Sequence, residues 1–186
     1  RTGAWKFYNA AGRLEQAGAY SNGRIDGTWR WYYPDGELLR EEDYYQGKRD
    51  GSYTEYSRTG EIIARGAYAD GERNGVWRVT TGDNTEEGEY LLGLRNGEWK
   101  SWYPDGKLRF KGEYKQGNPD GHHVLYFENG RPKEDRYYKN GFRTKSWKKY
   151  NELGEVFLTI TYRDDIETSI NGVTVNLPES SVRRIK

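Results

Sequence analysis

The chain contains no cysteine. Disulfide scaffolds, thiolate zinc sites and cysteine nucleophiles are therefore excluded. It also carries little excess charge, because 30 basic and 29 acidic side chains leave a formal net charge of +1. We do not expect a nucleic-acid partner, since binding to phosphate requires a basic surface. No stretch approaches the roughly 20 apolar residues that span a bilayer, so no membrane-spanning segment is predicted.

Aliphatic residues are scarce as well. The hydrophobic fraction is only 33%, which is low for a soluble domain. Such a composition is often a sign of disorder, but 7 Trp and 17 Tyr are too many for a chain that stays unfolded. Large rings bury roughly 150–250 Å² each. We therefore predict that aromatic rings replace the missing aliphatic core.

A repeat of 24 residues runs through the sequence, and its clearest copies are residues 27–36 and 97–106. One aromatic column follows a glycine in nearly every copy. A deletion of two residues between Trp77 and Gly82 shortens a single step to 22 residues. Such a period is typical of a tandem array in which each unit packs against its neighbours. The first aromatic column consists of Trp5, Trp29, Tyr53, Trp77, Trp99, His123 and Trp147.

Each repeat contains two short runs with strand character, separated by turn signals. In the second repeat, residues 28–33 are rich in aromatics, and Pro34-Asp35-Gly36 then provides turn chemistry. Asn-Gly and Asp-Gly pairs punctuate the rest of the chain, so helices are not expected. One repeat therefore predicts one β-hairpin. The fold class is all-β, with about seven tandem hairpins over residues 1–162 forming a twisted antiparallel sheet of about fourteen strands.

A second aromatic column lies three residues after the first. In a regular strand the two columns occupy opposite faces, whereas a bulge after the first aromatic would bring them together. The sequence leaves both arrangements open. The second column consists of Tyr8, Tyr32, Tyr56, Trp102, Tyr126 and Tyr150, with a gap at the deletion.

Residues 163–186 change in character. Asp164-Asp165 stands where a glycine is expected, and residues 170–178 form a more aliphatic run. We predict a C-terminal capping hairpin and tail, in which Pro178, Arg183, Arg184 and Lys186 discourage the addition of another strand. At the other end the sequence starts at Arg1 without a methionine. We expect a leader or an upstream segment to precede it.

The repeat pattern Tyr-x-x-Gly-(Lys/Arg)-x-(Asp/Asn)-Gly-x-Trp-x-x-(Trp/Tyr)-Tyr-x-(Asp/Asn)-Gly is legible from Tyr20 to Gly36 and from Tyr90 to Gly106. It resembles the MORN-repeat variant of bacterial proteins, including those called YwqK-type antitoxins. The resemblance implies an elongated, twisted, single-layer antiparallel sheet that serves protein association and, in some relatives, scaffolding near membranes. By the same analogy a homodimer formed through an end repeat is plausible.

This sequence departs from the family pattern at several positions. Tyr53 and His123 replace the tryptophan of the first column, and Lys145 replaces the glycine before Trp147. In the place of Trp31 stand Glu55 and Lys149. We expect the aromatic ladder to be weakest in these repeats.

Catalytic and metal-binding chemistry is not expected. His122 and His123 are adjacent, so in a strand they face opposite sides and cannot chelate one ion together. The acidic runs at 41–43, 86–87 and 164–165 are explained by solvated faces and turns. No glycine-rich loop opens a helix to hold a phosphate. The hypothesis is a non-enzymatic protein without a metal or cofactor.

The second aromatic column is the candidate partner-binding surface. We interpret the first column as structural and the second as lying exposed on a concave face beside basic side chains. Exposed Tyr, Trp and Arg dominate protein–protein hot spots. The candidate binding residues are Tyr32, Tyr56, Trp102, Tyr126 and Tyr150, together with Arg30, Arg78, Lys100 and Lys148.

Two functions are compatible with these residues. The first is a protein-interaction or scaffolding module, either an accessory subunit of a bacterial envelope complex or an antitoxin-like inhibitor. The alternative is a cell-wall carbohydrate or choline-type binding module, because aromatic platforms bind sugars and quaternary ammonium groups. The aromatic-rich, cysteine-free composition favours the bacterial cell envelope as the location, with the cytoplasm as the alternative.

Overall fold

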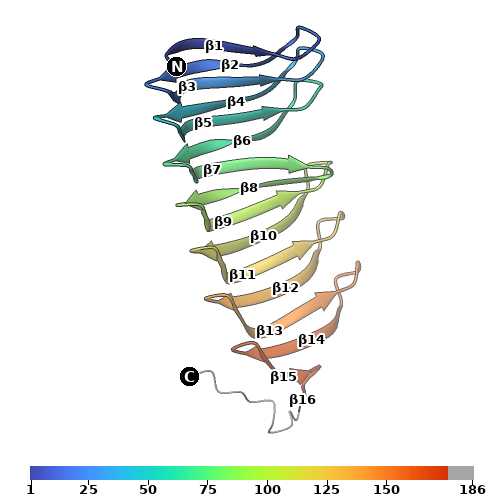
Figure 1. The fold of residues 1–186 in the computed structure, drawn as a ribbon. Helices are drawn as coiled ribbons and strands as arrows, with labels where there is room; N and C mark the ends of the chain where they lie inside the picture. The colour runs from blue at the N-terminus through green and yellow to red at the C-terminus, as the bar shows by residue number, and fades with distance from the viewer. Residues whose placement is uncertain (176–186) are drawn as a thin grey trace.

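The computed structural model describes residues 1–175, which form one open antiparallel sheet (Figure 1). The described residues contain no helix, so the all-β prediction is confirmed. Every strand pairs with its neighbours in chain order. The strands are β1 (Gly3–Tyr8), β2 (Leu14–Ser21), β3 (Arg24–Tyr32), β4 (Leu38–Tyr45), β5 (Lys48–Tyr56), β6 (Ile62–Ala69), β7 (Glu72–Thr81), β8 (Asn84–Leu91), β9 (Leu94–Trp102), β10 (Leu108–Lys115), β11 (Asn118–Tyr126), β12 (Pro132–Lys139), β13 (Phe142–Tyr150), β14 (Val156–Arg163), β15 (Ile166–Ile170) and β16 (Val173–Thr174).

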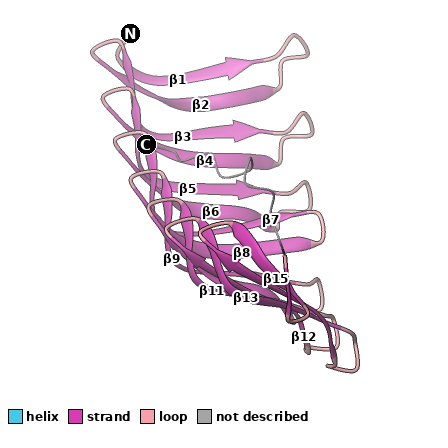
Figure 2. Ribbon diagram, turned by 90° about the horizontal axis from the view of Figure 1, so that it is seen from below, coloured by secondary structure: helices cyan, strands magenta, loops and turns pink. Residues whose placement is uncertain are grey.

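Each repeat supplies one hairpin of the sheet. Strands β1 to β14 correspond to the seven repeats, and the strand direction rotates progressively along the array (Figure 2). The C-terminal hairpin of β15 and β16 continues the same sheet, because β15 pairs with β14. The predicted roles of Pro178, Arg183, Arg184 and Lys186 fall outside the described residues.

Two-residue turns join the repeats to one another. Asn22 and Gly23 both have positive φ angles, of 50° and 81°. This is the backbone that a type I′ turn requires, and it matches the twist of the flanking strands. At the junction after β14, Asp164 and Asp165 adopt the same conformation without a glycine. The backbone N–H and Nε–H of Arg143 both donate to Oδ1 of Asp165, which stabilises that turn.

A bulge before the first aromatic column decides which face each column occupies. Between β2 and β3, Ala17 pairs with Arg30 while Ala19 pairs with Asp26, so the one residue between them on β2 faces three residues of β3. Gly27 takes up the extra length with a φ of 70°. From Trp29 to Tyr32, β3 has no extra residue, because the register shift between Trp31 and Tyr32 places the extra residue, Leu39, on β4. The two aromatic columns therefore lie on opposite faces.

We call the face with the first column the ring face, and it contains the core. Trp29, Trp77 and Trp99 are only 3%, 1% and 2% exposed. Each indole covers a glycine of the preceding strand so closely that a Cβ atom on Gly88 would lie 2.2 Å from Cδ2 of Trp99. The indole Nε1–H of Trp99 donates to the backbone carbonyl of Glu89 at 3.1 Å. The glycine therefore provides the room in which the ring lies flat on the sheet.

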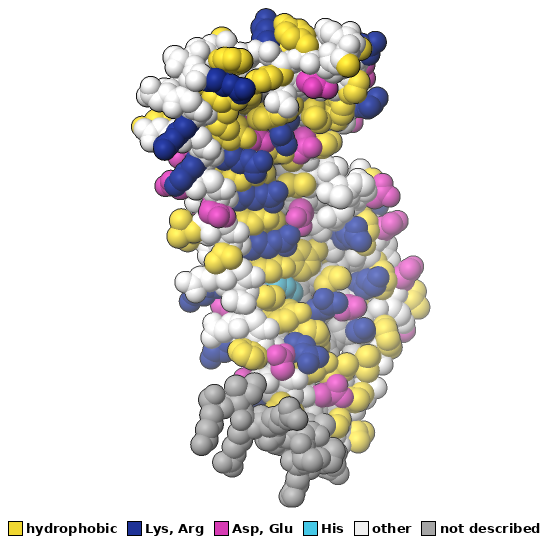
Figure 3. All heavy atoms as spheres, viewed as in Figure 1, with side chains coloured by type: hydrophobic (Ala, Val, Ile, Leu, Met, Phe, Trp, Pro, Cys, Tyr) yellow, Lys and Arg dark blue, Asp and Glu magenta, His cyan; other side chains and the backbone are white. Residues whose placement is uncertain are grey.

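Tyrosine and arginine side chains complete the burial of these rings. Tyr90 meets Trp99 edge to face, with ring centroids 4.9 Å apart. The guanidinium of Arg95 lies over Trp99 at 4.0 Å from the ring centroid, and Arg73 covers Trp77 at 4.3 Å. A space-filling view of one face shows Lys and Arg side chains alternating with hydrophobic ones along the array (Figure 3). The arginines thus shield the rings in the way that a second layer would.

One repeat replaces the glycine by a buried carboxylate. Glu42 is 1% exposed and occupies the position that Gly88 has elsewhere. The ring that follows it is Tyr53 instead of a larger tryptophan. Nε of Arg40 lies 2.7 Å and Nε of Arg49 3.0 Å from the Glu42 carboxylate, which is therefore paired on both sides.

The deletion shortens one turn without shifting the register. Between β7 and β8, Thr81 pairs with Asn84 and the pairing has no bulge. Thr80 consequently lies opposite Thr85, and Trp102 of the next strand lies opposite Thr85 on its other side. Thr80 therefore fills the place in the second column that an aromatic residue occupies in the other repeats.

Substituting Gly88 by alanine tests the contact between ring and glycine. The new methyl group would overlap Trp99, so we expect the free energy of unfolding to fall by about 3 kcal/mol. Urea denaturation monitored by tryptophan fluorescence measures it. Glu89→Ala, at the neighbouring exposed position, should change the same quantity by less than about 0.5 kcal/mol. Equal stability of the two variants would contradict the packing described.

Candidate functional site

We call the opposite side of the sheet the charged face, and it carries the second aromatic column. Tyr32 lies opposite Leu38, and Trp102 lies opposite Leu108, so each ring has an aliphatic neighbour on the next strand. The rings are half-buried and not fully exposed. The residues placed in this way are Tyr32, Tyr56, Trp102, Tyr126 and Tyr150.

Beside these rings runs a column of mostly charged residues, which we call the central charge column. Its members lie directly opposite one another from strand to strand, so that neighbours interact across the sheet. Arg30 pairs with Glu41 at 2.5 Å, and Arg78 pairs with Glu87 at 3.0 Å. In chain order the column consists of Lys6, Ala17, Arg30, Glu41, Thr54, Arg65, Arg78, Glu87, Lys100, Lys111, Val124, Asp135, Lys148 and Thr159.

The candidate basic residues Arg30, Arg78, Lys100 and Lys148 all belong to the central charge column. Direct contact with the second aromatic column is seen for Arg78, whose guanidinium lies 5.0 Å from the ring centroid of Trp102. Close pairs of aromatic rings lie on the ring face, apart from the pair formed by His122 and Tyr137. The structure therefore brings the candidates together as two parallel columns and not as one cluster.

Some residues near this face were not singled out from the sequence. The hydroxyl of Tyr33 donates to the carbonyl of Tyr56 at 2.9 Å, and that of Tyr103 donates to the carbonyl of Tyr126 at 2.7 Å. These bonds join one repeat to the next. In the sequence, these residues could have been found as the second aromatic of the Tyr-Tyr and Trp-Tyr pairs, at positions 32–33 and 102–103.

Asp135 forms a small polar cluster on the charged face. It accepts a hydrogen bond from the Tyr150 hydroxyl at 2.6 Å, and Nε2 of His122 lies 3.0 Å from its other oxygen. Burial and the bond to Asp135 raise the pKa of Tyr150 to about 12. The His122 ring stacks on Tyr137 with centroids 4.4 Å apart. The phenol of Tyr150 therefore stays protonated and is held in one orientation.

His123 lies on the other side of the sheet from His122. It is 3% exposed, and its Nε2 lies 2.7 Å from the carbonyl of Glu113, as the indole nitrogens do in other repeats. Burial lowers its pKa below the ordinary value of 6.5. Among residues 1–175, no three His, Cys, Asp or Glu side chains converge in a way that could hold a metal ion. The site offers ring surfaces and paired charges instead.

Comparison with known protein families identifies three of the repeats. The family model described as the MORN repeat variant matches residues 25–46, 95–116 and 119–140. Each matched segment covers one hairpin, made of an odd-numbered strand and the strand after it, and ends in the next turn. No curated protein sequence matches the chain. In the described part of the chain, no helix has the length and apolar character needed to cross a bilayer.

The buried His123 predicts a loss of stability in mild acid. Its pKa is lowered in the folded state, so below about pH 6.5 the unfolded chain binds more protons than the folded one. We expect the free energy of unfolding to fall with pH between 7 and 5, by up to about 1.4 kcal/mol per pH unit from this group. Urea denaturation of the wild type and of His123→Phe at each pH isolates the contribution, since other groups cancel. Parallel pH profiles would refute it.

Proposed function

We propose that this chain is a non-enzymatic protein-interaction module that presents its charged face to a partner protein. The observation that supports this proposal most strongly is the difference between the two faces of the sheet. On the ring face, Trp29, Trp77 and Trp99 are almost wholly covered by the chain's own side chains. On the charged face, half-buried Tyr and Trp rings stand beside Arg and Lys. These residue types supply most of the energy in protein interfaces.

The family match supports the general class of this proposal. The MORN repeat variant occurs at three places in the chain, and MORN repeats are generally associated with protein- and membrane-binding modules. Within that class we propose either an accessory role in a bacterial envelope assembly or inhibition of a partner in the manner of an antitoxin. The cysteine-free, aromatic-rich composition is compatible with both.

A carbohydrate or choline-type ligand is the second candidate, and the geometry favours it less. A cage for a quaternary ammonium group needs several rings around one cation. The second-column rings stand on alternate strands, and the cationic Arg78 already covers Trp102. Arg30 and Lys100 would also repel a positively charged ligand.

Alanine substitutions in the second column test the proposed interface. Tyr32→Ala, Trp102→Ala and Tyr126→Ala should each weaken binding to a partner captured from the native source by about 30-fold, which corresponds to a hot spot of about 2 kcal/mol. Isothermal titration calorimetry on the captured partner measures the change.

The control for these variants is Tyr45→Ala. Tyr45 is 62% exposed and lies beside a turn at the far end of the strands from Tyr32, so its loss should leave binding unchanged. Circular dichroism should show melting temperatures within about 4 °C of wild type for all variants. A collapse in melting temperature for the three test variants would show that the rings are core residues and would refute the interface.

A further inference from the structure

A hollow of about 560 Å³ opens on the charged face across β6 and β7. We propose that it binds an extended segment of a partner protein in which one acidic side chain lies between two apolar ones. The inference deepens the proposed function, on which it rests, because the hollow lies on the face assigned to the partner. It adds the chemistry of the partner and one place of contact.

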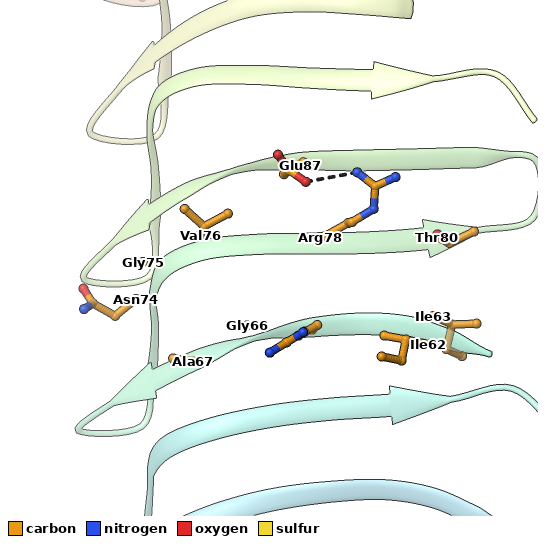
Figure 4. Close-up of a pocket in the computed structure, with 11 residues that line it drawn as sticks. Ile62, Ile63, Gly66, Ala67, Asn74, Gly75, Val76, Arg78, Thr80 and Glu87 are labelled. Carbon is orange, nitrogen blue, oxygen red and sulfur yellow. Dashed lines mark hydrogen bonds and ion pairs between the residues drawn. The ribbon is translucent and has the colours of Figure 1, made fainter. Parts of the chain in front are cut away.

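The hollow exists because the second aromatic column is interrupted there. Thr80 stands where Tyr56 and Trp102 stand in the neighbouring repeats. Thr80 lies at one end of the hollow and Val76 near the other, while Arg78 projects between them toward Glu87 (Figure 4). The missing ring thus leaves a trough along the strands, open to solvent.

Two arginines lie directly opposite each other in this trough. Arg65 of β6 pairs in register with Arg78 of β7, and like charges in that position destabilise a sheet. Arg78 is neutralised by Glu87 at 3.0 Å. Among the described residues, no acidic oxygen lies within ion-pair distance of Arg65, and no hydrogen-bond acceptor is assigned to it. Arg65 is exposed in the hollow, so its guanidinium is accessible to an external anion.

The comparable lysine pair shows that this chain can compensate such a contact internally. Lys100 and Lys111 also lie directly opposite each other in the central charge column. Both contact Glu98, at 2.5 Å and 2.6 Å. The chain thus supplies an acidic side chain that contacts both Lys100 and Lys111, but none that contacts both Arg65 and Arg78. The trough is therefore a place where a partner can supply the anion.

Apolar side chains lie at both ends of the trough. Ile62 is 51% and Val76 is 66% exposed, and Ile63 also lines the hollow. Ile63 and Arg65 are two residues apart on β6, as are Val76 and Arg78 on β7, so each strand presents an apolar group one side-chain step from its arginine. An extended segment has the same step of two residues. The complementary pattern is apolar-x-acidic-x-apolar.

Other anionic partners fit the trough less well. A membrane surface would meet the acidic side chains of the same column, Glu41, Glu87 and Asp135, and a formal charge of +1 offers no attraction at a distance. A small inorganic anion would leave the exposed Ile62 and Val76 uncovered. A peptide segment satisfies the charge and the apolar ends together.

The test uses the full chain and a fluorescein-labelled peptide, Gly-Leu-Ser-Glu-Ser-Leu-Gly, with its Glu→Gln counterpart. Fluorescence anisotropy should show weak binding of the acidic peptide, with a dissociation constant of roughly 100 μM, since a short flexible ligand loses much entropy on binding. Arg65→Ala should weaken it about tenfold. Thr80→Tyr, which restores the ring found in other repeats, should abolish it by filling the trough. Lys111→Ala, on the same face but paired with Glu98, should have no effect.

Several results would overturn the proposal. Equal affinity for the Glu and Gln peptides, or equal losses in Arg65→Ala and Lys111→Ala, would remove the anion site. Binding to phosphatidylserine vesicles that depends on Arg65, without peptide binding, would assign the trough to a membrane. Tyr126→Ala, on a distant strand, separates the two proposals. It should leave the peptide bound while weakening the native partner, whereas the proposed function fails if the native partner is unaffected by every second-column variant.

Discussion

The structure depends on burying large aromatic rings in a sheet that has no second layer. The indoles of Trp29, Trp77 and Trp99 each lie flat on a glycine of the preceding strand, and this close approach removes one face of each ring from water. A tyrosine edge and an arginine guanidinium then cover what remains. Rings and glycines recur together because the glycine provides the room for the ring, and at Trp77 and Trp99 an arginine completes the cover. This requirement explains a chain with few aliphatic residues and many repeats.

Burial on the ring face leaves the charged face free to carry differences between repeats. Its central charge column contains cross-strand pairs of opposite charge, such as Arg30 with Glu41, that satisfy one another. Like charges lie opposite each other at Lys100 with Lys111 and at Arg65 with Arg78, and beside the second of these pairs the chain also lacks a second-column ring. This irregular repeat is where we propose that a partner segment binds, and the regular repeats form a frame around it.

The repeat period predicted the hairpins and both aromatic columns, since each of these follows from residue type and spacing. It could not decide the relative faces of the columns, because that depends on whether a bulge falls between Trp29 and Tyr32, and the structure instead places the bulge of this strand before Trp29, at Gly27. The role of Glu42 was also hidden. Its equivalence to Gly88 is visible only when strand pairing shows that Tyr53 is the ring that follows it. The hydrogen bond from the Tyr33 hydroxyl to the Tyr56 carbonyl was not predicted either, because it depends on the distance between the strands.

The strict pairing of each strand with its neighbours in chain order has a mechanical consequence. The edges of the described sheet are β1 and β16, and every junction between them is a ladder of backbone hydrogen bonds. Tension applied across these edges acts along the bonds, so it loads one ladder at a time instead of shearing several together. Under a pull the array should lengthen in successive small steps, hairpin by hairpin, and yield gradually at low force.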